Sequence, residues 1–370
     1  MLQDGTHLAE SSEEKEAVYR FRYAVYVEEM GRYRGVADHD RRRFYEPEDE
    51  TARIFYAAID GEVVATSRFN WGGDAPFTAR LIDHYRLEPF LAEIPAEQIA
   101  VGERGMVRPD LRGSQIFWEL GEKSQAFIGQ KRVQLIFGAC EPHLLSRYVS
   151  QGSRTFASKN INSADSGYLI PIVNVVEDIE YLKRIGSPSV ATTRDWGDDK
   201  RIPDCIERLL ADQGNVLSQR LVDSGLYLGE VNHSLEDLNE HQISTLEGLT
   251  SEEVLGVIDK SNIIHCAPGD HVIKKGGTAR NMFILLEGHV EVRDEDSLLG
   301  VLNPGDVFGA AAFLLEQPRV VDMYAATPCR ILSLSENTVR KLIESNALGA
   351  AHLMLNVAKI LCLRLLETRS

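Results

Sequence analysis

The chain has 370 residues, which is more than one ordinary domain needs and about enough for two domains and a linker. Its 40 Lys and Arg against 56 Asp and Glu give a formal net charge of −16, with 44% hydrophobic and 26% charged residues. This composition is typical of a globular, soluble, acidic protein, and it argues against nucleic-acid binding, because phosphate recognition needs concentrated Lys and Arg.

Cysteine usage and the apolar runs indicate the compartment. Five cysteines form no closely spaced pair, so neither a disulfide framework nor a CxxC zinc or redox site is indicated. The N-terminus lacks the basic start and apolar run of a signal peptide, and no apolar stretch approaches the ~20 residues that span a bilayer. We expect a cytoplasmic protein with no metal site and no membrane span.

The first half of the chain predicts an α+β domain over residues 1–185. Apolar residues at helical spacing indicate an amphipathic helix, and Asp60-Gly61 joins two β-rich runs as a hairpin turn. Strands and helices then alternate to a closing pair of strands. The predicted elements are a helix at 13–30, a hairpin at 52–70, a strand at 98–110, a helix at 115–132, a strand at 133–140, a helix at 142–152, and strands at 154–158 and 167–176.

Two further regions follow this domain. A Gly-, Ser-, Pro- and Asp-rich stretch opens an acidic, largely helical linker over 186–248. Within a domain at 249–370, Thr250 or Ser251 caps a helix at 249–258. Short period-two runs broken by Pro-Gly-Asp and Gly-Gly turns then predict a small antiparallel barrel or jelly roll, closed by helices at 335–345 and 346–368.

The turn from Val107 to Ser114 leads a strand into a helix within 101–150, a net-positive block. Backbone N–H groups in such a turn, with the helix dipole, can hold a pyrophosphate or phosphopantetheine phosphate. The order of elements and this turn resemble the GNAT acyltransferase fold, a mixed sheet with flanking helices, over residues 10–180. The resemblance implies that the thioester of acyl-CoA or of an acyl carrier protein binds at Met106, Val107, Arg112, Gly113, Ser114 and Gln115.

The same turn departs from the usual GNAT pattern. Gln115 and Phe117 stand where that family has small residues, and a bulky Phe narrows a phosphate cradle. The chain looks more like the autoinducer-synthase and long-chain N-acyl amino acid synthase branch, whose loops are degenerate. Arg22, Tyr26 and Arg68 are similar to residues of that branch's signature, and the resemblance assigns them to an acceptor pocket. The pair Glu103-Arg104 is similar to the branch's Glu-containing strand motif. Asp38 and Asp40 match its acidic pair only loosely.

Acyl transfer to an amine needs a base for the amine proton and an acid for the leaving thiolate. Glu103 can act as the base, directly or through a water. Tyr148 matches the family's Tyr-x-x-x-Gly turn, which implies that its hydroxyl protonates the thiolate. The structural alternatives are a Glu103 that is salt-bridged beside Arg104 and a Tyr148 that only packs in the core.

A basic cluster interrupts the acidic N-terminal region at Arg32, Arg34, Arg41, Arg42 and Arg43. The ordinary interpretation of such a run is a solvated face. The functional interpretation is a docking surface for an acidic acyl carrier protein or for a carboxylate-bearing acceptor, because opposite potentials steer association.

Residues 250–368 resemble the cyclic-nucleotide-binding fold, through Pro268-Gly269-Asp270, Gly276, the run 283–290, the run 302–309 and Pro318-Arg319. In that family Phe-Gly-Glu opens a phosphate-binding cassette, the Glu holds the ribose hydroxyl, and an Arg neutralises the cyclic phosphate. This chain has Gly309 and Arg319 but Ala310 in place of the Glu, with Asp322 nearby. Those changes weigh against tight cyclic AMP binding; a barrel kept for dimerisation or for holding the enzyme domain is the alternative.

The last helix carries small and apolar residues at alternating steps of three and four, a seam suited to a partner helix. They are Ala351, Leu355, Ala358, Cys362 and Leu365. We expect a homodimer through this helix, or else packing within the chain.

These observations together predict an N-acyltransferase. It moves a fatty acyl group from a carrier-protein or CoA thioester to an amine such as an amino acid, and carries a regulatory or dimerising cyclic-nucleotide-binding-like domain. One alternative is a cyclic-nucleotide-regulated protein-lysine acetyltransferase, which would use short acyl-CoA. The other is a non-catalytic sensory or scaffold protein.

Overall fold

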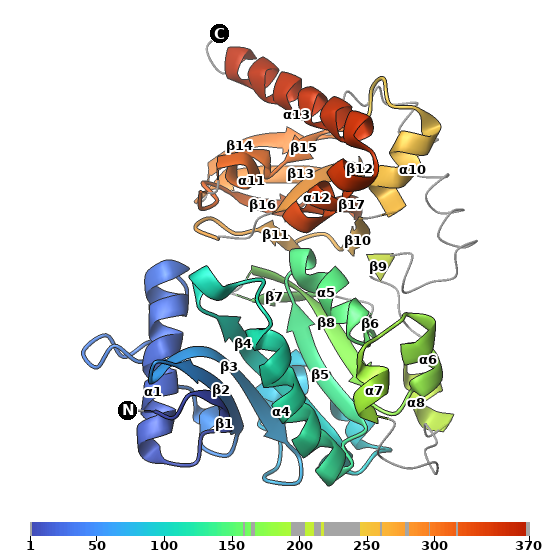
Figure 1. Ribbon diagram of the computed structural model, residues 1–370. Helices are drawn as coiled ribbons and strands as arrows, with labels where there is room; N and C mark the ends of the chain where they lie inside the picture. The colour runs from blue at the N-terminus through green and yellow to red at the C-terminus, as the bar shows by residue number, and fades with distance from the viewer. Residues whose placement is uncertain are drawn as a thin grey trace. The chain divides into compact units, whose positions relative to one another are not determined.

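Figure 1 shows the computed structural model, which describes residues 2–157, 160–163, 167–193, 204–210, 216–217, 245–259, 261–277, 281–295, 297–315 and 317–367. The chain divides into two compact units. Unit 1 comprises Met1–Ala139, Ser150–Phe156 and Pro171–Ala211, and unit 2 comprises Cys140–Val149, Ala157–Ile170 and Asp212–Ser370.

A mixed sheet forms the centre of unit 1, with the strand order β1-β2-β3-β4-β5-β8-β6. β4 and β5 run parallel, whereas β1, β2, β3 and β4 pair antiparallel in succession. The strands are β1 (Gly5–Leu8), β2 (Arg53–Ile59), β3 (Glu62–Trp71), β4 (Ile99–Val107), β5 (Leu135–Cys140), β6 (Ser153–Thr155) and β8 (Gly167–Val175). β1 lies in a region for which the sequence predicted no strand.

Alternating side chains of β2 explain why helices lie on both faces of this sheet. Ile54 and Tyr56 belong to one apolar cluster with residues of α1. Phe55 and Ala57 belong to another cluster with residues of α4, which crosses the sheet in Figure 1. Because successive side chains of a strand point to opposite faces, a single seven-residue strand contributes to both cores.

Local sequence signals account for the helix and turn boundaries of unit 1. Ser11 and Glu14 form a reciprocal capping box that starts α1, and Asp60 and Gly61 both have positive φ in the predicted hairpin turn. The predicted helix at 13–30 is an α-helix followed by a π-helix, η1 (Tyr23–Glu29). The helices are α1 (Ser12–Arg22), α2 (Ala79–His84), α3 (Glu88–Leu91), α4 (Ile116–Lys131), α6 (Ile179–Arg184), α7 (Ser189–Thr193) and α8 (Asp204–Leu209).

Unit 2 contains two antiparallel sheets, with the strand orders β15-β12-β17-β10-β9 and β11-β16-β13-β14. Its chain also includes β7 (Ile161–Ser163), which pairs with the first residues of β8. The strands of the two sheets are β9 (Val216–Leu217), β10 (Asn262–Cys266), β11 (His271–Ile273), β12 (Asn281–Glu287), β13 (Val290–Asp294), β14 (Ser297–Leu302), β15 (Val307–Phe308), β16 (Asp322–Ala325) and β17 (Cys329–Ser335).

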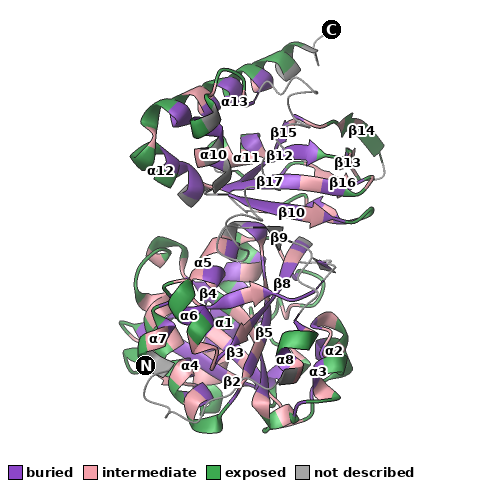
Figure 2. Cartoon of the chain, turned by 90° about the vertical axis from the view of Figure 1, so that its right-hand side faces the viewer, coloured by how far each residue is buried: buried purple, intermediate pink, exposed green. Residues whose placement is uncertain are grey.

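Helices complete unit 2 and cover its main apolar core. β12 and β17 are buried along most of their length, and residues of α10, α12 and α13 join their core (Figure 2). Thr250 caps α10 in a reciprocal contact with Glu253, as the sequence predicted. Asn356 of α13 donates to the backbone oxygens of Thr245 and Glu247. The helices are α5 (Leu145–Ser150), α10 (Ser251–Asp259), α11 (Ala310–Leu315), α12 (Glu336–Ser345) and α13 (Ala347–Glu367).

The predicted α+β class and the β-rich C-terminal domain are confirmed. The predicted linker at 186–248 lies largely outside the described residues, so its helical character stays a prediction. Within the part that is described, it includes α7, α8 and the two-residue strand β9. Among the described residues, the search for a membrane-crossing helix found none of sufficient length and apolarity.

Candidate functional site

The parallel ladder between β4 and β5 of unit 1 ends after a short stretch. The paired residues run from Ile99 and Leu135 to Val101 and Phe137, although both strands continue beyond that point. In the same region the register between β3 and β4 shifts, and Arg104 takes a φ of 56°. A non-glycine residue in the left-handed region of a strand marks a β-bulge, so β4 is bent close to the end of this ladder.

The turn after β4 places the predicted thioester-binding residues in two environments. Met106 and Val107 are buried at the end of β4, whereas the residues from Arg112 to Gln115 are exposed ahead of α4. Gln115 is the N-cap of α4 and makes no side-chain cap hydrogen bond. The Ile116 N–H donates to Ser114 Oγ at 3.4 Å, and the Trp118 N–H donates to the Gln115 backbone oxygen at 2.8 Å, so these N–H groups have partners within the chain.

The Arg112 side chain is tied to its own unit. Its Nη1 lies 2.7 Å from Glu29 Oε1, and its Nε donates to the backbone oxygen of Val107 at 3.2 Å. Gly113 next to it has a φ of +89°, which a side chain would strain. The turn is thus fixed by one ion pair and one glycine.

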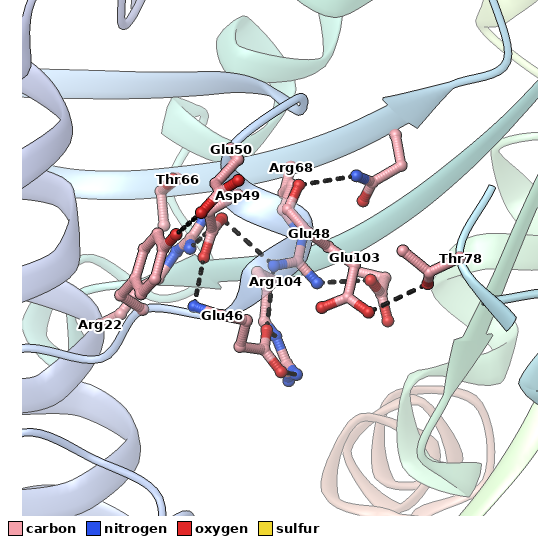
Figure 3. Close-up of polar contacts among 12 residues, drawn as sticks. Arg22, Glu46, Glu48, Asp49, Glu50, Thr66, Arg68, Thr78, Glu103 and Arg104 are labelled. Atoms are coloured by element: carbon pink, nitrogen blue, oxygen red, sulfur yellow. Dashed lines mark hydrogen bonds and ion pairs between the residues drawn. The ribbon is translucent and has the colours of Figure 1, made fainter. Parts of the chain in front are cut away.

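A buried cluster of ion pairs fills the space beside the β4 bulge (Figure 3). The Arg22 Nη1 atom lies 2.7 Å from Asp49 Oδ1, and Arg68 Nη1 lies 3.1 Å from the same oxygen. Arg68 also reaches Glu46 Oε2 at 2.9 Å and, through Nη2, Glu103 Oε2 at 2.5 Å. Arg22, Asp49 and Arg68 have no solvent-exposed side-chain surface. Such charges are tolerated in a core only when they are paired, which the cluster achieves.

Glu103, the predicted base, is surrounded by donors. Its carboxylate accepts from Arg68, from Arg80 Nη2 at 3.0 Å and from the Tyr85 hydroxyl at 2.9 Å. Burial alone would raise the pKa of Glu103, but Arg68, Arg104 and Arg80 hold it well below its ordinary value. Glu103 is therefore ionised at neutral pH and has low basicity. Glu103 is therefore salt-bridged, as the structural alternative to a catalytic base predicted.

Arg104 sits in an aromatic cage next to Glu103 in the chain. Its guanidinium carbon lies 5.5 Å from the ring centroid of Tyr26, 4.7 Å from that of Tyr33 and 5.3 Å from that of Phe44. Its Nε donates to Glu46 Oε2 at 2.6 Å. Burial raises the pKa of Tyr26, so that phenol stays neutral. The structure thus joins Arg68 directly to Glu103, Arg22 to Arg68 through the shared Asp49 carboxylate, and Tyr26 to the cluster through Arg104.

Several members of the cluster were not predicted from the sequence. They are Glu46, Glu48, Asp49, Arg80 and Tyr85. The acidic segment that supplies the first three was visible in the sequence, but nothing local separates it from a solvated charge run. Asp38, which the resemblance paired with Asp40, instead makes a partly exposed ion pair with Arg43, and Asp49 is the acid that meets Arg22 and Arg68.

The basic cluster of the N-terminal region is partly neutralised within the chain. Arg42 pairs with Glu28, and Arg43 pairs with both Glu16 and Asp38. Arg34 and Arg41 are exposed, and the described residues include no ion-pair partner for either side chain. These two arginines therefore carry the free positive charge of the loop.

Tyr148, the predicted acid, belongs to unit 2, where it lies in α5 and is partly buried. Since Glu103 belongs to unit 1, the pairing of these two residues stays a prediction. In unit 2 itself, α5 follows the short helical turn Pro142–Leu144.

The second candidate site surrounds Arg319 in unit 2. Arg319 is buried, and its Nη1 donates to the Gly309 backbone oxygen at 2.5 Å. Its Nη2 donates to the backbone oxygen of Asn281 at 2.5 Å and to its Oδ1 at 2.8 Å. These acceptors are neutral, and no carboxylate contacts Arg319 among the described residues. Burial lowers the pKa of Arg319 to about 10, and the negative charge of Glu141 only partly opposes this shift.

Gly309 is required by this arrangement. A Cβ there would lie 2.5 Å from Arg319 Nη1, and its φ of +73° favours glycine in any case. Ala310 follows as the first residue of α11 and is buried. The Asp322 carboxylate is engaged elsewhere, because its Oδ1 lies 2.8 Å from His271 Nε2 and accepts from the Lys275 backbone N–H at 2.8 Å. The predicted residues Gly309, Ala310 and Arg319 therefore lie in one place.

The predicted seam of α13 lies on the exposed side of that helix. Ala351, Leu355, Ala358 and Cys362 are exposed, whereas Leu353, Val357 and Ile360 are buried in the core of unit 2. The side chain of Leu365 lies outside the description. The seam is therefore not used for packing within the described part of unit 2.

Unit 2 is a two-sheet antiparallel fold closed by helices, with a buried arginine beside a glycine turn. Residues 263–346 match the family model described as Cyclic nucleotide-binding domain. This match supports the predicted cyclic-nucleotide-binding-like domain in the C-terminal part of the chain.

Curated relatives match only a part of this chain. A Glutaminase 2 from Bradyrhizobium diazoefficiens is 30% identical over 136 residues, which are 36% of this chain and 22% of that protein. A cAMP-dependent protein kinase regulatory subunit from Mycosarcoma maydis is 28% identical over 110 residues, which are 27% of this chain and 21% of that protein. The chain thus spans about a fifth of the length of these curated relatives.

Solved structures show a similar partial coverage. A cyclic nucleotide-binding domain from Methylobacillus flagellatus is 16% identical, with a TM-score of 0.34, over 39% of this chain and 88% of that one. As for metals, no group of three or more His, Cys, Asp or Glu that could hold an ion was found in the described part of the chain.

Proposed function

We propose that unit 1 is an N-acyltransferase, which moves a fatty acyl group from an acyl-CoA or acyl-carrier-protein thioester to an amine such as an amino acid. The observation that carries the proposal is the end of the β4–β5 ladder close to the bulge of β4, followed by the turn 108–115, whose residues 112–115 are exposed. A gap between diverging strands can receive an extended thioester, and N–H groups at the start of α4 can meet its phosphates.

The reaction joins an amine nitrogen to the thioester carbonyl carbon and breaks the C–S bond. The amine proton must leave, and Glu103 is ionised and able to accept it or to orient a water that does. Because its pKa lies well below the ordinary value, Glu103 is a weak base, and we propose that its carboxylate orients the water that takes the proton and does not keep the proton itself. For Tyr148 we propose only the role that the family resemblance implies, which is donation of the proton that the leaving thiolate takes up.

Thiol release from acyl-CoA of graded chain length, and from acyl carrier protein, tests this proposal. We expect Glu103→Gln and Tyr148→Phe to lose most of the turnover, while Glu119→Gln, an exposed glutamate on α4, serves as the matched control and keeps it. Turnover that is unchanged in both variants would refute the assigned roles. A wild-type protein that releases no thiol from any donor would favour the non-catalytic scaffold, which the fully paired environment of Glu103 also supports.

The same assay distinguishes the N-acyltransferase from the second candidate enzyme. A protein-lysine acetyltransferase would use acetyl-CoA and a lysine peptide in preference to a long acyl donor and a free amino acid. We rank it below the N-acyltransferase because Gln115 and Phe117 occupy the phosphate turn where small residues would widen it.

Arg34 and Arg41 carry positive charge without ion-pair partners in the described chain, so they favour an acidic acyl carrier protein as the acyl donor. We propose that it docks at Arg34 and Arg41, which are exposed and lack ion-pair partners in the described chain. Replacing both with Ala should weaken carrier binding more at low than at high salt. Arg42→Ala is the control, because Arg42 already pairs with Glu28. Equal losses in the two proteins would contradict the docking surface.

Unit 2 is proposed to be a regulatory domain that binds the phosphate of a cyclic nucleotide at Arg319. The support is the desolvated guanidinium, which neutral oxygens contact and no carboxylate does. Calorimetry with cyclic AMP and cyclic GMP tests this, and we expect stoichiometric binding that Arg319→Ala abolishes. No binding of either nucleotide by the wild type would leave a degenerate domain that serves dimerisation.

Dimerisation is proposed to use the exposed seam of α13. Leu355 and Cys362 recur at a heptad spacing on its solvent side, as coiled-coil seams require. Light scattering of Leu355→Glu should show a shift from dimer to monomer, with Lys359→Glu as the exposed control on the same helix. A wild type that is already monomeric would overturn this part.

A further inference from the structure

Strand pairing in unit 2 brings together two cysteines that are far apart in the sequence. β10 and β17 run antiparallel, and Cys266 is directly opposite Cys329 in their register. Directly opposed residues of an antiparallel pair have Cα atoms about 4.5–5.5 Å apart. A disulfide needs a Cα separation of about 4.4–6.8 Å, so the backbone already satisfies the requirement.

The two side chains also share one face of the sheet, as opposed residues do. Both thiols are free and buried, and Cys329 is among the charges that bear on Cys266. At present the thiols contact other groups. Cys266 Sγ lies 3.4 Å from the Tyr168 hydroxyl, and Cys329 Sγ lies 3.2 Å from the His289 backbone oxygen. Rotation about χ1 is the movement needed to bring the sulfurs together.

The position of the pair in the ladder makes it accessible to chemistry. Cys266 and Cys329 form the last pair of the β10–β17 register, where β10 ends and β17 begins. The end of a ladder opens more easily than its middle, because fewer hydrogen bonds must break. The chain between the two cysteines contains Gly309 and Arg319, so a bond here closes a loop around the whole candidate phosphate site.

We propose that Cys266 and Cys329 are a redox modification site, which a peroxide converts into a cross-strand disulfide that staples β10 to β17. One thiolate attacks hydrogen peroxide, which gives a sulfenic acid and hydroxide, and the proton lost from the thiol turns the hydroxide into water. The second thiol then attacks the sulfenic sulfur, the S–S bond forms, and a second water leaves. Two electrons pass from the two thiols to the peroxide, which is fully reduced.

The environment sets the rate of this reaction. Burial raises the pKa of both thiols, so little thiolate exists at neutral pH and the first step is slow. We therefore expect the disulfide to form faster as the pH rises from 7 to 9. Once formed, it constrains the unfolded chain over a long loop, and unit 2 should become harder to unfold by urea.

The test uses the full chain with Cys362→Ser, because Cys362 is exposed and would form intermolecular bonds. After treatment with hydrogen peroxide, free thiols are blocked in denaturant and the protein is digested with trypsin. Peptides 261–274 and 320–330 carry the two cysteines, and we expect them to appear linked, with a mass two hydrogens below their sum. Reduction should separate them.

Two variants sharpen the result. Cys329→Ser should leave peptide 261–274 without any linked partner, whereas Cys140→Ser, which removes another buried cysteine, should leave the linked pair unchanged. If Cys329→Ser does not fold, the linked peptides of the parent protein still decide the question. Recovery of both peptides with blocked thiols after exhaustive oxidation, or Cys266 linked to a different cysteine, would overturn the proposal.

Discussion

Arg68→Met isolates the electrostatic contribution of the buried cluster in unit 1. The Arg68 guanidinium faces the carboxylates of Glu46, Asp49 and Glu103 at 2.9, 3.1 and 2.5 Å, and its side chain has no exposed surface. Methionine keeps most of the buried volume, so the change removes charge without opening a large cavity. Breaking a buried ion pair by removing one partner costs about 3–5 kcal/mol. Because each carboxylate keeps another arginine partner, we expect a loss near the lower end, about 3 kcal/mol.

Tryptophan fluorescence can follow this loss in unit 1 alone. All three tryptophans, at 71, 118 and 196, fall within the ranges of unit 1. With a urea slope of about 2 kcal/mol/M, the unfolding midpoint at pH 7 should fall by about 1.5 M. Adding Glu103→Gln to Arg68→Met should cost less than the two single changes together, since one charge no longer lacks its partner.

The pH dependence of the urea midpoint shows whether the lost charge causes the destabilisation of Arg68→Met. In the wild type, the pKa of Glu103 is depressed, so its stabilisation is lost as the pH falls below about 4.5 toward the folded value. Without Arg68 that pKa lies closer to the unfolded value, and the variant loses less in acid. The difference in the free energy of unfolding between the wild type and Arg68→Met should therefore become smaller below pH 4.5. A midpoint unchanged at pH 7, or a difference of constant size down to pH 3, would refute the reasoning.

Three further predictions concern single features of each unit. Burial opposes ionisation of Asp49, but Arg22 and Arg68 lower its pKa, so the Trp-monitored stability of unit 1 should be constant from pH 5 to 7 and decline from pH 4 to 2. Gly309→Ala, whose Cβ would displace the nearby guanidinium, should cost about 1–2 kcal/mol in unit 2 by circular dichroism and weaken nucleotide binding more than tenfold. Asn356→Ala leaves two backbone oxygens without their buried donor, and should cost about 1–3 kcal/mol in the same unfolding assay.

Local sequence patterns predicted the elements whose signals are local. The Asp60-Gly61 turn, the helix after the thioester turn and the Thr250 cap all depend on residues within a few positions of one another, and the structure contains each of them. The glycine turns of the C-terminal domain are similarly local, and the resemblance that they carry agrees with the family model that matches residues 263–346. Caps and turns of this kind can be predicted from the sequence without any knowledge of tertiary contacts.

The candidate site of unit 1 could be predicted only in part, because its ion pairs join distant segments. Arg22 meets an acid 27 positions away, and Glu103 meets Arg80 from a short helix that the sequence did not predict. No periodicity marks Asp49 as buried, since acidic runs are usually solvated. The left-handed Arg104 is likewise invisible in sequence, because its conformation follows from the register shift between β3 and β4.

The buried arginines of the two units have different hydrogen-bond partners, and this difference predicts which unit binds an anion. In unit 1, Arg22 and Arg68 contact carboxylates, so an added anion finds charges that are already compensated. In unit 2, Arg319 contacts neutral oxygens, and the charge of Glu141 compensates it only in part, so an anion in contact with Arg319 gains Coulomb energy. A ligand that binds the folded state stabilises it by RT ln(1 + [L]/Kd). Cyclic AMP should therefore raise the unfolding temperature of unit 2 followed by circular dichroism and leave the tryptophan-monitored transition of unit 1 in place. A shift confined to the tryptophan signal would mean that the phosphate binds in unit 1 and that the compensation argument fails.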